Sequence, residues 1–527
     1  MSGVLTVMSM IVRKRSREMV DMRNPGGSGL RSMLIASALA LIVVAGHTAC
    51  RNDTSAGGGA LRTAAAPAAS AAPVSESGPW NIVFILADDM GWNQTGYGWN
   101  RTAYPGEPFY ETPHIDRLAA QGMTFTDAYA AAPICSPSRA ALMTGKYPAR
   151  LHITDYIPGN RFPYARLVTQ PMVQRLPLEE ITIPELLKAK GYVSGHFGKW
   201  HLNADYNYVP GRPFDPGSQG FDDVYTATKP TEKADPYSDP HRVEEITRRS
   251  IRFLEANKDK PFFLYVAHHV VHRPLHETPE HIAKYQAKWG SQLAEHHPVM
   301  GAMIERMDDG IGRILAKLDE LRLTNRTLVV FTSDNGGLEL LQSQYPLRGG
   351  KAMLWEGGLR VPLAVRWPGV VAPGSTSTVP VSTQDFFPTL AELAGLTPQI
   401  AGLDGVSLVP LLRQTGPIPR DALYWHYPHY HHLGYQPSGA IRAGDFKVIE
   451  WYEPSLTNGP HPIALYNVRE DTGERVDLAG TMPDKARDLL DKLRAWRARV
   501  GAQEMTVNPR FDASRARWPT KDAPGES

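Results

Sequence analysis

Short runs of continuously apolar residues recur along this chain of 527 residues and constrain its fold more than any other feature. The first run is NIVFILA at residues 81–87, and similar runs are PFFLYVA from Pro261 and TLVVFTS at residues 327–333. A run without polar alternation is typical of a strand buried on both faces, as in a parallel sheet. Helical patterns lie between these runs, and one opens at Thr112, the expected N-cap, with proline next. The alternation predicts an α/β fold.

The texture changes at about residue 421, where alternating strands joined by turns precede the helical segment DKARDLLDKLRAWRARV. This pattern predicts a small antiparallel sheet covered by one helix. We therefore expect a large mixed, mostly parallel sheet sandwiched by helices over residues 80–420. A smaller C-terminal domain of antiparallel sheet plus helix would follow over residues 421–510, and residues 511–527 would form a flexible tail.

The N-terminal region resembles an export signal. The apolar run MLIASALALIVVAG at residues 33–46 follows two arginines and is short for a membrane span. It ends in HTAC, which resembles a bacterial lipoprotein cleavage site with Cys50 as the lipidated residue; an ordinary cleaved signal and an uncleaved anchor are the alternatives. We expect residues 1–50 to be a signal peptide, and residues 51–79, rich in Ala, Ser, Gly and Pro, to be a disordered tether. The protein would be exported to the periplasm or anchored at the outer membrane.

Charge and cysteine content exclude two classes of protein. The formal net charge of +2 leaves no electrostatic footprint for nucleic acid, so a small molecule or a glycan is the expected partner. The two cysteines, Cys50 and Cys135, lie in different local contexts, which argues against a disulfide framework.

Three polar clusters follow predicted strands. Asp88 and Asp89 end the first strand, three histidines (His268, His269 and His272) follow another, and the sequence SDNG at residues 333–336 ends a third. Ligands of open α/β sheets bind at the carboxyl ends of the strands, so these clusters are expected to meet there. Carboxylates and an amide oxygen favour calcium or magnesium over zinc, which makes Asp88, Asp89, Asp334 and Asn335 candidate ligands. Each pair could instead cap the helix that follows it.

Cys135 precedes a predicted helix that has Pro137 in its first turn. Backbone donors and the positive end of the helix dipole suit an anionic group at position 135, and Arg139 adds a cation one turn later. A buried inert thiol and a reactive thiolate both remain possible for such a cysteine.

The segment CSPSR at residues 135–139, continuing ALMTGKYPAR, closely resembles the signature of the formylglycine-dependent sulfatases, which are arylsulfatase-like members of the alkaline phosphatase superfamily. Further matching segments are LADDMGW, GKWHL at residues 198–202, the strand and histidines of residues 261–274, TSDNG, and LRGGKAMLWEGGLRVP from Leu347. The resemblance covers essentially the whole chain from Trp80. It implies hydrolysis of sulfate esters through a covalent sulfate intermediate, after a maturation enzyme has oxidised Cys135 to formylglycine.

The resemblance also implies roles for individual residues. Calcium, with magnesium less expected, would be held by Asp88, Asp89, Asp334, Asn335 and modified Cys135. Arg139 and Lys199 would stabilise the hydrated aldehyde, and Lys199 would also reach the sulfate. His201 would help to release sulfate, while His272 and Lys351 would bind the sulfate and assist the leaving oxygen. His269 is the alternative to His272.

The segment YWHYPHYHH at residues 424–432 is dense in aromatic rings and imidazoles. An aromatic wall with hydrogen-bonding tips is a plausible sugar-binding surface, which makes His426, His429 and His431 candidate substrate contacts. A packing seam between the two domains is the alternative.

Two other functions compete with a sulfatase acting on a sulfated carbohydrate or an aryl sulfate. One is a phosphomonoesterase or phosphodiesterase of the same superfamily, which usually has a serine or threonine nucleophile and two zinc ions. The other is an exported glycan-binding lipoprotein with an inactive site. The setting of Cys135 and the Asp334-Asn335 pair argue against the first, and the filled catalytic positions argue against the second.

Overall fold

The computed structural model describes residues 79–98, 109–204, 209–289 and 297–516, and the statements below concern this part of the chain. The predicted signal peptide, Cys50 and nearly all of the tether lie outside it. In the described ranges no helix is both long enough and apolar enough to cross a membrane.

A mixed sheet of eight strands has the order β10-β2-β9-β8-β1-β7-β5-β6. β1 (Asn81–Ala87) runs parallel to its two neighbours, β7 (Phe262–Ala267) and β8 (Thr327–Ser333). β9 is antiparallel to both β8 and β2. The other strands are β2 (Met123–Phe125), β5 (Val193–Gly198), β6 (Asp223–Thr226), β9 (Leu363–Arg366) and β10 (Ser375–Ser377). The predicted mixed, mostly parallel sheet is confirmed.

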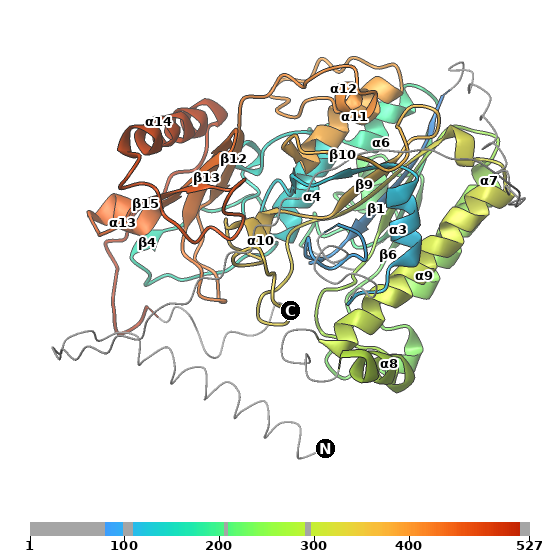
Figure 1. Cartoon of the computed structure of the whole chain (residues 1–527), viewed down its shortest axis with the longest axis horizontal. Helices are drawn as coiled ribbons and strands as arrows, with labels where there is room; N and C mark the ends of the chain where they lie inside the picture. The colour runs from blue at the N-terminus through green and yellow to red at the C-terminus, as the bar shows by residue number, and fades with distance from the viewer. Residues whose placement is uncertain (1–78, 99–108, 205–208, 290–296, 517–527) are drawn as a thin grey trace, which may run out of the picture. The chain divides into compact units, whose positions relative to one another are not determined.

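The two faces of this sheet pack against separate hydrophobic cores because successive side chains of a strand point in opposite directions. In β1, Phe84 lies in one core and Ile85 in the other. The first core is shared with α4 (Cys135–Thr144), α5 (Pro148–Leu151), α6 (Ile183–Lys188), α11 (Phe386–Leu393) and α12 (Val409–Leu412). The second is shared with α3 (Pro113–Ala120), α7 (Val243–Asn257), α8 (Pro279–Trp289) and α9 (Pro298–Glu320). Figure 1 shows β1 of this sheet between the helices α4 and α3. The result is a sheet sandwiched by helices.

The α3 helix begins as expected, but Thr112 does not cap it with its side chain. The carboxylate of Asp308, on α9, accepts hydrogen bonds from the backbone N–H groups of His114 and Ile115 at 2.9 and 2.8 Å. Thr112 instead donates to Asp116. A residue almost two hundred positions away therefore satisfies the start of this helix, which a local sequence pattern does not reveal.

A second sheet lies towards the C-terminus, with the antiparallel order β12-β13-β14-β15. Its strands are β12 (Leu423–Tyr427), β13 (Ser438–Ala443), β14 (Phe446–Trp451) and β15 (Ile463–Asn467). The helix α14 (Pro483–Val500) covers one face, where Leu493 and Trp496 pack with Val448. On the other face Trp425 and Ile449 lie in one cluster with Cys135. This domain therefore packs directly behind the start of α4.

Shorter elements connect these parts. Two small sheets pair β3 (Ala128–Tyr129) with β11 (Val381–Ser382) and β4 (Leu167–Val168) with β16 (Thr506–Val507). The remaining helices are α10 (Glu356–Leu359), α13 (Tyr452–Thr457), η1 (Pro216–Gln219), η2 (Pro236–Ser238), η4 (Thr324–Arg326) and η5 (Thr383–Asp385). The β4–β16 pair joins the segment after α5 to the chain beyond α14.

Candidate active site

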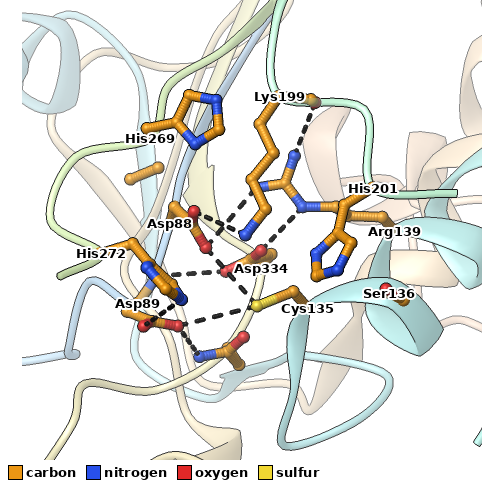
Figure 2. A network of polar contacts seen from close by, with 12 residues as sticks. Asp88, Asp89, Cys135, Ser136, Arg139, Lys199, His201, His269, His272 and Asp334 are labelled. Atoms are coloured by element: carbon orange, nitrogen blue, oxygen red, sulfur yellow. Dashed lines mark hydrogen bonds and ion pairs between the residues drawn. The ribbon is translucent and has the colours of Figure 1, made fainter. Parts of the chain in front are cut away.

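Four acidic and amide side chains meet where β1 and β8 end. Asp88 and Asp89 follow β1, Asp334 and Asn335 follow β8, and the two strands pair up to their last residues. The backbone N–H of Asp89 donates to the Asp334 carboxylate at 3.2 Å, which joins the two strand ends. All four side chains are buried. Figure 2 shows Asp88, Asp89 and Asp334 converging with Cys135, as the strand-end argument predicts.

This cluster has the composition of a site for a hard divalent cation. Asp88, Asp89, Cys135 and Asp334 each offer a ligand atom, and these atoms all lie within 4.8 Å of one another. The Asn335 amide lies against Asp89, and its oxygen has no hydrogen-bond partner within the described ranges. A half-turn of the amide would bring that oxygen to the cluster. The donor set therefore fits calcium or magnesium.

Three cations surround the carboxylates. Lys199 Nζ lies 2.7 Å from Asp88, Arg139 Nε lies 2.8 Å from Asp334, and Lys351 Nζ lies 3.0 Å from Asp89. Burial raises the pKa of Asp334 to about 6, and the negative charge of Asp88 adds to the rise. Burial also opposes ionisation of Asp88, but Lys199 and the other nearby cations outweigh it and hold the pKa of that carboxyl well below its usual range. The site thus concentrates charges of both signs out of water.

Cys135 is the first residue of α4 and only 1% exposed. Its Sγ lies 3.6 Å from Asp88 Oδ1 and 3.9 Å from Asp89 Oδ1, so the sulfur faces the carboxylate cluster. Burial raises the pKa of this thiol well above its usual value. The unmodified side chain is therefore a neutral thiol, which argues against the reactive-thiolate alternative.

Arg139 and Lys199 support each other across the site. The Arg139 guanidinium pairs with Asp334 and donates through Nη1 to the Lys199 carbonyl at 3.0 Å. Lys199 directly follows β5, and the preceding residue, Gly198, has a φ of 118°. A Cβ at Gly198 would lie 1.8 Å from the Ala267 carbonyl oxygen, so only glycine allows this approach to β7.

His201 and Ser136 are both held by a backbone segment that the sequence analysis did not single out. The Nε2 of His201 lies 2.9 Å from the Ile157 carbonyl oxygen, and the Ile157 N–H donates to the Ser136 hydroxyl at 3.1 Å. Burial and the positive charge of Lys199 lower the pKa of His201 well below its usual value. The imidazole is therefore neutral and suited to accept a proton. Neither contact has a local sequence signal, because both depend on how segments meet in space.

The two candidates for the leaving-group histidine lie in different surroundings. His272 Nε2 lies 3.7 Å from Asp89 Oδ2, beside the cluster. His269 Nε2 contacts the Ala227 carbonyl oxygen at 2.7 Å, and burial and Lys199 lower the pKa of this imidazole. Figure 2 shows His272 next to Asp89 and His269 farther from Cys135. The geometry favours His272.

The three candidate histidines of the aromatic segment, His426, His429 and His431, are buried and stand outside the carboxylate cluster. His426 contacts the Tyr452 hydroxyl at 2.7 Å and the Gln503 carbonyl at 3.0 Å. Both partners belong to the C-terminal domain, so His426 packs within that domain. His429 Nε2 lies 2.8 Å from the Thr154 hydroxyl, and the His431 ring stacks on Tyr435. A sugar-binding role for this segment stays a prediction.

Comparison with known proteins identifies the family. A family model described as Sulfatase matches residues 80–396, and one described as N-sulphoglucosamine sulphohydrolase, C-terminal, matches residues 350–497. The chain is 31% identical to arylsulfatase A of Homo sapiens, with 87% of this chain and 93% of that protein covered. It is 35% identical to N-acetylgalactosamine-6-sulfatase of Homo sapiens, with 66% and 68% covered.

Solved structures agree with this assignment. A crystal structure of Ps i-CgsB in complex with k-i-k-neocarrahexaose aligns with a TM-score of 0.65 at 26% sequence identity, covering 83% of this chain and 96% of that one. The chain therefore belongs to the sulfatase family and is a sulfuric ester hydrolase.

Proposed function

We propose that this enzyme hydrolyses sulfate esters of carbohydrates with a formylglycine nucleophile made from Cys135. The observation that carries the proposal is the position of the Cys135 sulfur at the start of α4, within 4 Å of two carboxylates that are themselves paired with lysines. The sulfur marks where an oxygen of the hydrated aldehyde would stand. A neutral thiol in this place has no nucleophilic role of its own, which supports its conversion to another group.

The residues around Cys135 fit a metal-assisted site. Asp88, Asp89, Asp334 and Asn335, with an oxygen of residue 135, would hold calcium, or magnesium as the alternative. A bound divalent cation supplies charge neutralisation for the carboxylates and for the sulfate oxygens.

Sulfuryl transfer to residue 135 needs positive charge around the sulfate and a proton for the departing alcohol. Lys199 and Lys351 are placed to bind sulfate oxygens, since their ammonium groups lie on Asp88 and Asp89, the two carboxylates that face the Cys135 sulfur. A hydroxyl oxygen of the aldehyde hydrate would attack sulfur, its proton would pass to one of the carboxylates that face residue 135, and the bond from sulfur to the substrate oxygen would break. His272, beside Asp89, donates a proton to that oxygen.

The second half of the cycle regenerates the aldehyde. His201 takes the proton of the remaining hydroxyl, the carbonyl reforms, and the bond from carbon to the sulfate oxygen breaks. The lowered pKa of His201 supports this role because a neutral imidazole accepts a proton. A serine or an unmodified cysteine has no second hydroxyl and could not expel sulfate in this way.

A sulfated carbohydrate is the proposed substrate class, with an aryl sulfate as the alternative. Support comes from relatives whose names include an N-acetylgalactosamine-6-sulfatase and from the structural neighbour in complex with k-i-k-neocarrahexaose. Export, with a lipid at Cys50, is part of the proposal, since glycans of this kind lie outside the cytoplasm.

Mass spectrometry of the peptide containing Cys135 tests the nucleophile. Protein made in a host with the maturation enzyme should show an aldehyde or its hydrate in place of the thiol. The same preparation should hydrolyse 4-nitrophenyl sulfate much faster than 4-nitrophenyl phosphate, and Cys135→Ala should abolish both. Finding only the thiol in an active preparation would refute the proposed nucleophile, and faster phosphate hydrolysis would favour the phosphoesterase alternative.

A further inference from the structure

A groove of about 470 Å³ lies along the chain that follows α5, between residues 158–174 and the segment at residues 508–510 beyond β16. The side chains that matter for its chemistry are those of Arg161, Phe162, Gln170, Gln174, His429 and Arg510. None of them takes part in the reaction proposed above. His429 belongs to the aromatic segment that the sequence analysis singled out.

The groove begins at the wall of the active site. Ile157 contacts His201 through its carbonyl oxygen at 2.9 Å and Ser136 through its N–H at 3.1 Å, and the next residue, Pro158, lines the groove. Arg161 is four residues from Ile157, so its Cα lies at most about 14 Å from the Ile157 Cα. The groove therefore lies within the length of a short oligosaccharide from the residues around Cys135.

The groove carries a net positive charge. Arg161 and Arg510 are exposed, and their guanidinium groups make no hydrogen bond or ion pair with any residue in the described ranges. The neighbouring Arg166 is different, because it pairs with Glu453 at 3.1 Å. The one acid of the lining, Asp155, is buried and already accepts hydrogen bonds from the Tyr427 hydroxyl and the Asn160 N–H. It does not neutralise the two arginines.

Other lining groups suit a sugar. The side-chain amides of Gln170 and Gln174 make no hydrogen bond within the described part of the chain, so both can bind hydroxyl groups. Phe162 adds an aromatic surface, with its ring 6.3 Å from that of Tyr430. Two guanidinium groups, two side-chain amides and an aromatic ring together fit a negatively charged carbohydrate.

We infer that this groove binds a second anionic group of the substrate, a sulfate or a carboxylate on a sugar near the one that carries the scissile sulfate. The inference rests on the proposed function and narrows it, because the substrate becomes an oligosaccharide with at least two anionic groups. Arg161 and Arg510 are specificity-determining residues in this scheme. They act on binding and leave the chemistry at residue 135 unchanged.

Kinetics with two substrates test the inference. The variants are Arg161→Gln, Arg510→Gln and the double variant, and the matched control is Arg499→Gln, an exposed arginine on α14 that has no ion pair within the described residues. The substrates are 4-nitrophenyl sulfate and oligosaccharides of four to six sugars from carrageenan and chondroitin sulfate. Each groove variant should raise the KM for a cleaved oligosaccharide about tenfold, because a charge-assisted hydrogen bond is lost, with kcat unchanged. The difference should shrink at high salt, and turnover of the aryl sulfate should stay within about twofold.

Calorimetry separates this inference from the proposed function. The Cys135→Ala protein should bind the same oligosaccharides, and adding Arg161→Gln and Arg510→Gln should weaken that binding. If the wild type releases no sulfate from any substrate, the proposed function is wrong, and the calorimetry still decides the groove. Three results would each overturn the inference. One is an equal loss of activity on both substrates, and another is oligosaccharide binding that does not change when the arginines are replaced. The third is an enzyme that cleaves the aryl sulfate but neither binds nor cleaves any of these oligosaccharides.

Discussion

The surroundings of Cys135 show how a few residues set the chemistry of a position. The sulfur lies at the start of a helix, is removed from water, and faces Asp88 and Asp89 rather than a base that would ionise it. Burial keeps the thiol protonated. The nearby cations bind the acids instead of the sulfur in this arrangement. This arrangement is consistent with the proposed conversion of Cys135 to an oxygen nucleophile and with an anionic substrate.

Calcium should stabilise the protein because three buried carboxylates repel one another and a divalent cation relieves that repulsion. We expect calcium to raise the Tm by ~5 °C relative to protein treated with a chelator, measured by scanning fluorimetry at constant ionic strength. Asn335→Ala should reduce this rise by removing one ligand. Asn325→Ala, an exposed amide in η4, is the control. A Tm that is insensitive to calcium in the wild type would contradict the assigned metal site.

Residues whose side-chain type suggests a specific chemistry could be identified from the sequence. Residues that contribute only through where their backbone lies could not. Asp88, Asp334 and Cys135 could be singled out because carboxylates that follow buried strands, and a cysteine at a helix start, suggest a specific chemistry by their type and place. Ile157 could not, since its contribution to His201 is a backbone carbonyl that any residue carries. The choice between the two candidate histidines after β7 also required coordinates, because both follow the same strand.

At the scale of elements, strands made of long apolar runs were predictable from the sequence, and strands of three residues were not. The runs at residues 81–87 and 327–333 have the bounds of β1 and β8. The edge strand β10 and its neighbour β2 have three residues each, too few for a periodic pattern, and they form only because the sheet offers them partners. The candidate metal ligands follow β1 and β8, which are long apolar strands, and this is why the sequence could predict where the site lies.

The contact between α3 and α9 gives a pH-dependent prediction. Burial raises the pKa of Asp308 to about 7, so ionising this carboxyl in the folded protein opposes stability. Because the folded pKa lies above the unfolded one, this destabilisation grows as pH rises from about 4 to about 7. Relative to the wild type, Asp308→Asn should gain about 2 kcal/mol in free energy of unfolding between pH 5 and pH 8, measured by urea denaturation.

The exposed neighbour Asp309 provides the matched control for this experiment. Asp309→Asn keeps the same helix and the same change in charge without altering the cap of α3. A difference between Asp308→Asn and the wild type that stays constant from pH 5 to pH 8 would show that the carboxyl remains ionised in both folded and unfolded chains.

For the whole molecule, a buried ionic network connects the C-terminal sheet to the loop after β8, which carries two of the candidate metal ligands. Lys447 on β14 is fully buried and pairs with Glu356 at 3.0 Å and Glu474 at 2.9 Å. Glu356 is the first residue of α10. The Gly358 carbonyl of this helix accepts a hydrogen bond at 3.0 Å from the N–H of Gly336, in the loop after β8. The second domain is thus tied to the candidate metal site.

Replacing Lys447, the cation of this ionic network, should affect both stability and catalysis. Lys447→Met removes the one lysine that pairs with both buried carboxylates, although Glu356 keeps its contacts with Tyr129 and Arg360 and Glu474 keeps the hydrogen bond from the Glu356 N–H. Loss of one partner of a buried ion pair typically lowers the free energy of unfolding by about 3–5 kcal/mol. We expect a lower Tm and a fall in kcat on 4-nitrophenyl sulfate, with partial recovery in Lys447→Arg. Lys485→Met, an exposed lysine on α14, should behave as the wild type. Wild-type Tm and kcat in Lys447→Met would show that the network does not position the loop after β8.

The C-terminal sheet and its covering helix were predictable from alternating strands and an amphipathic pattern, but the use of the other face was not. Trp425 and Ile449 lie in the same cluster as Cys135, and nothing local to either segment indicates that they meet. Contacts between parts of the chain about three hundred residues apart depend on the complete fold. The same holds for Lys447, which as a sequence letter resembles any surface lysine.

The burial of Cys135 also has a consequence for biosynthesis. Because Cys135 is 1% exposed and the C-terminal domain packs behind it, another enzyme could not bind this segment in the folded protein. Any enzyme that oxidises the sulfur must therefore reach it while the chain is still open, before the C-terminal sheet docks. Under the proposed mechanism, the yield of active protein then depends on whether Cys135 is oxidised before the chain folds, and a molecule that folds first would stay inactive until it unfolds.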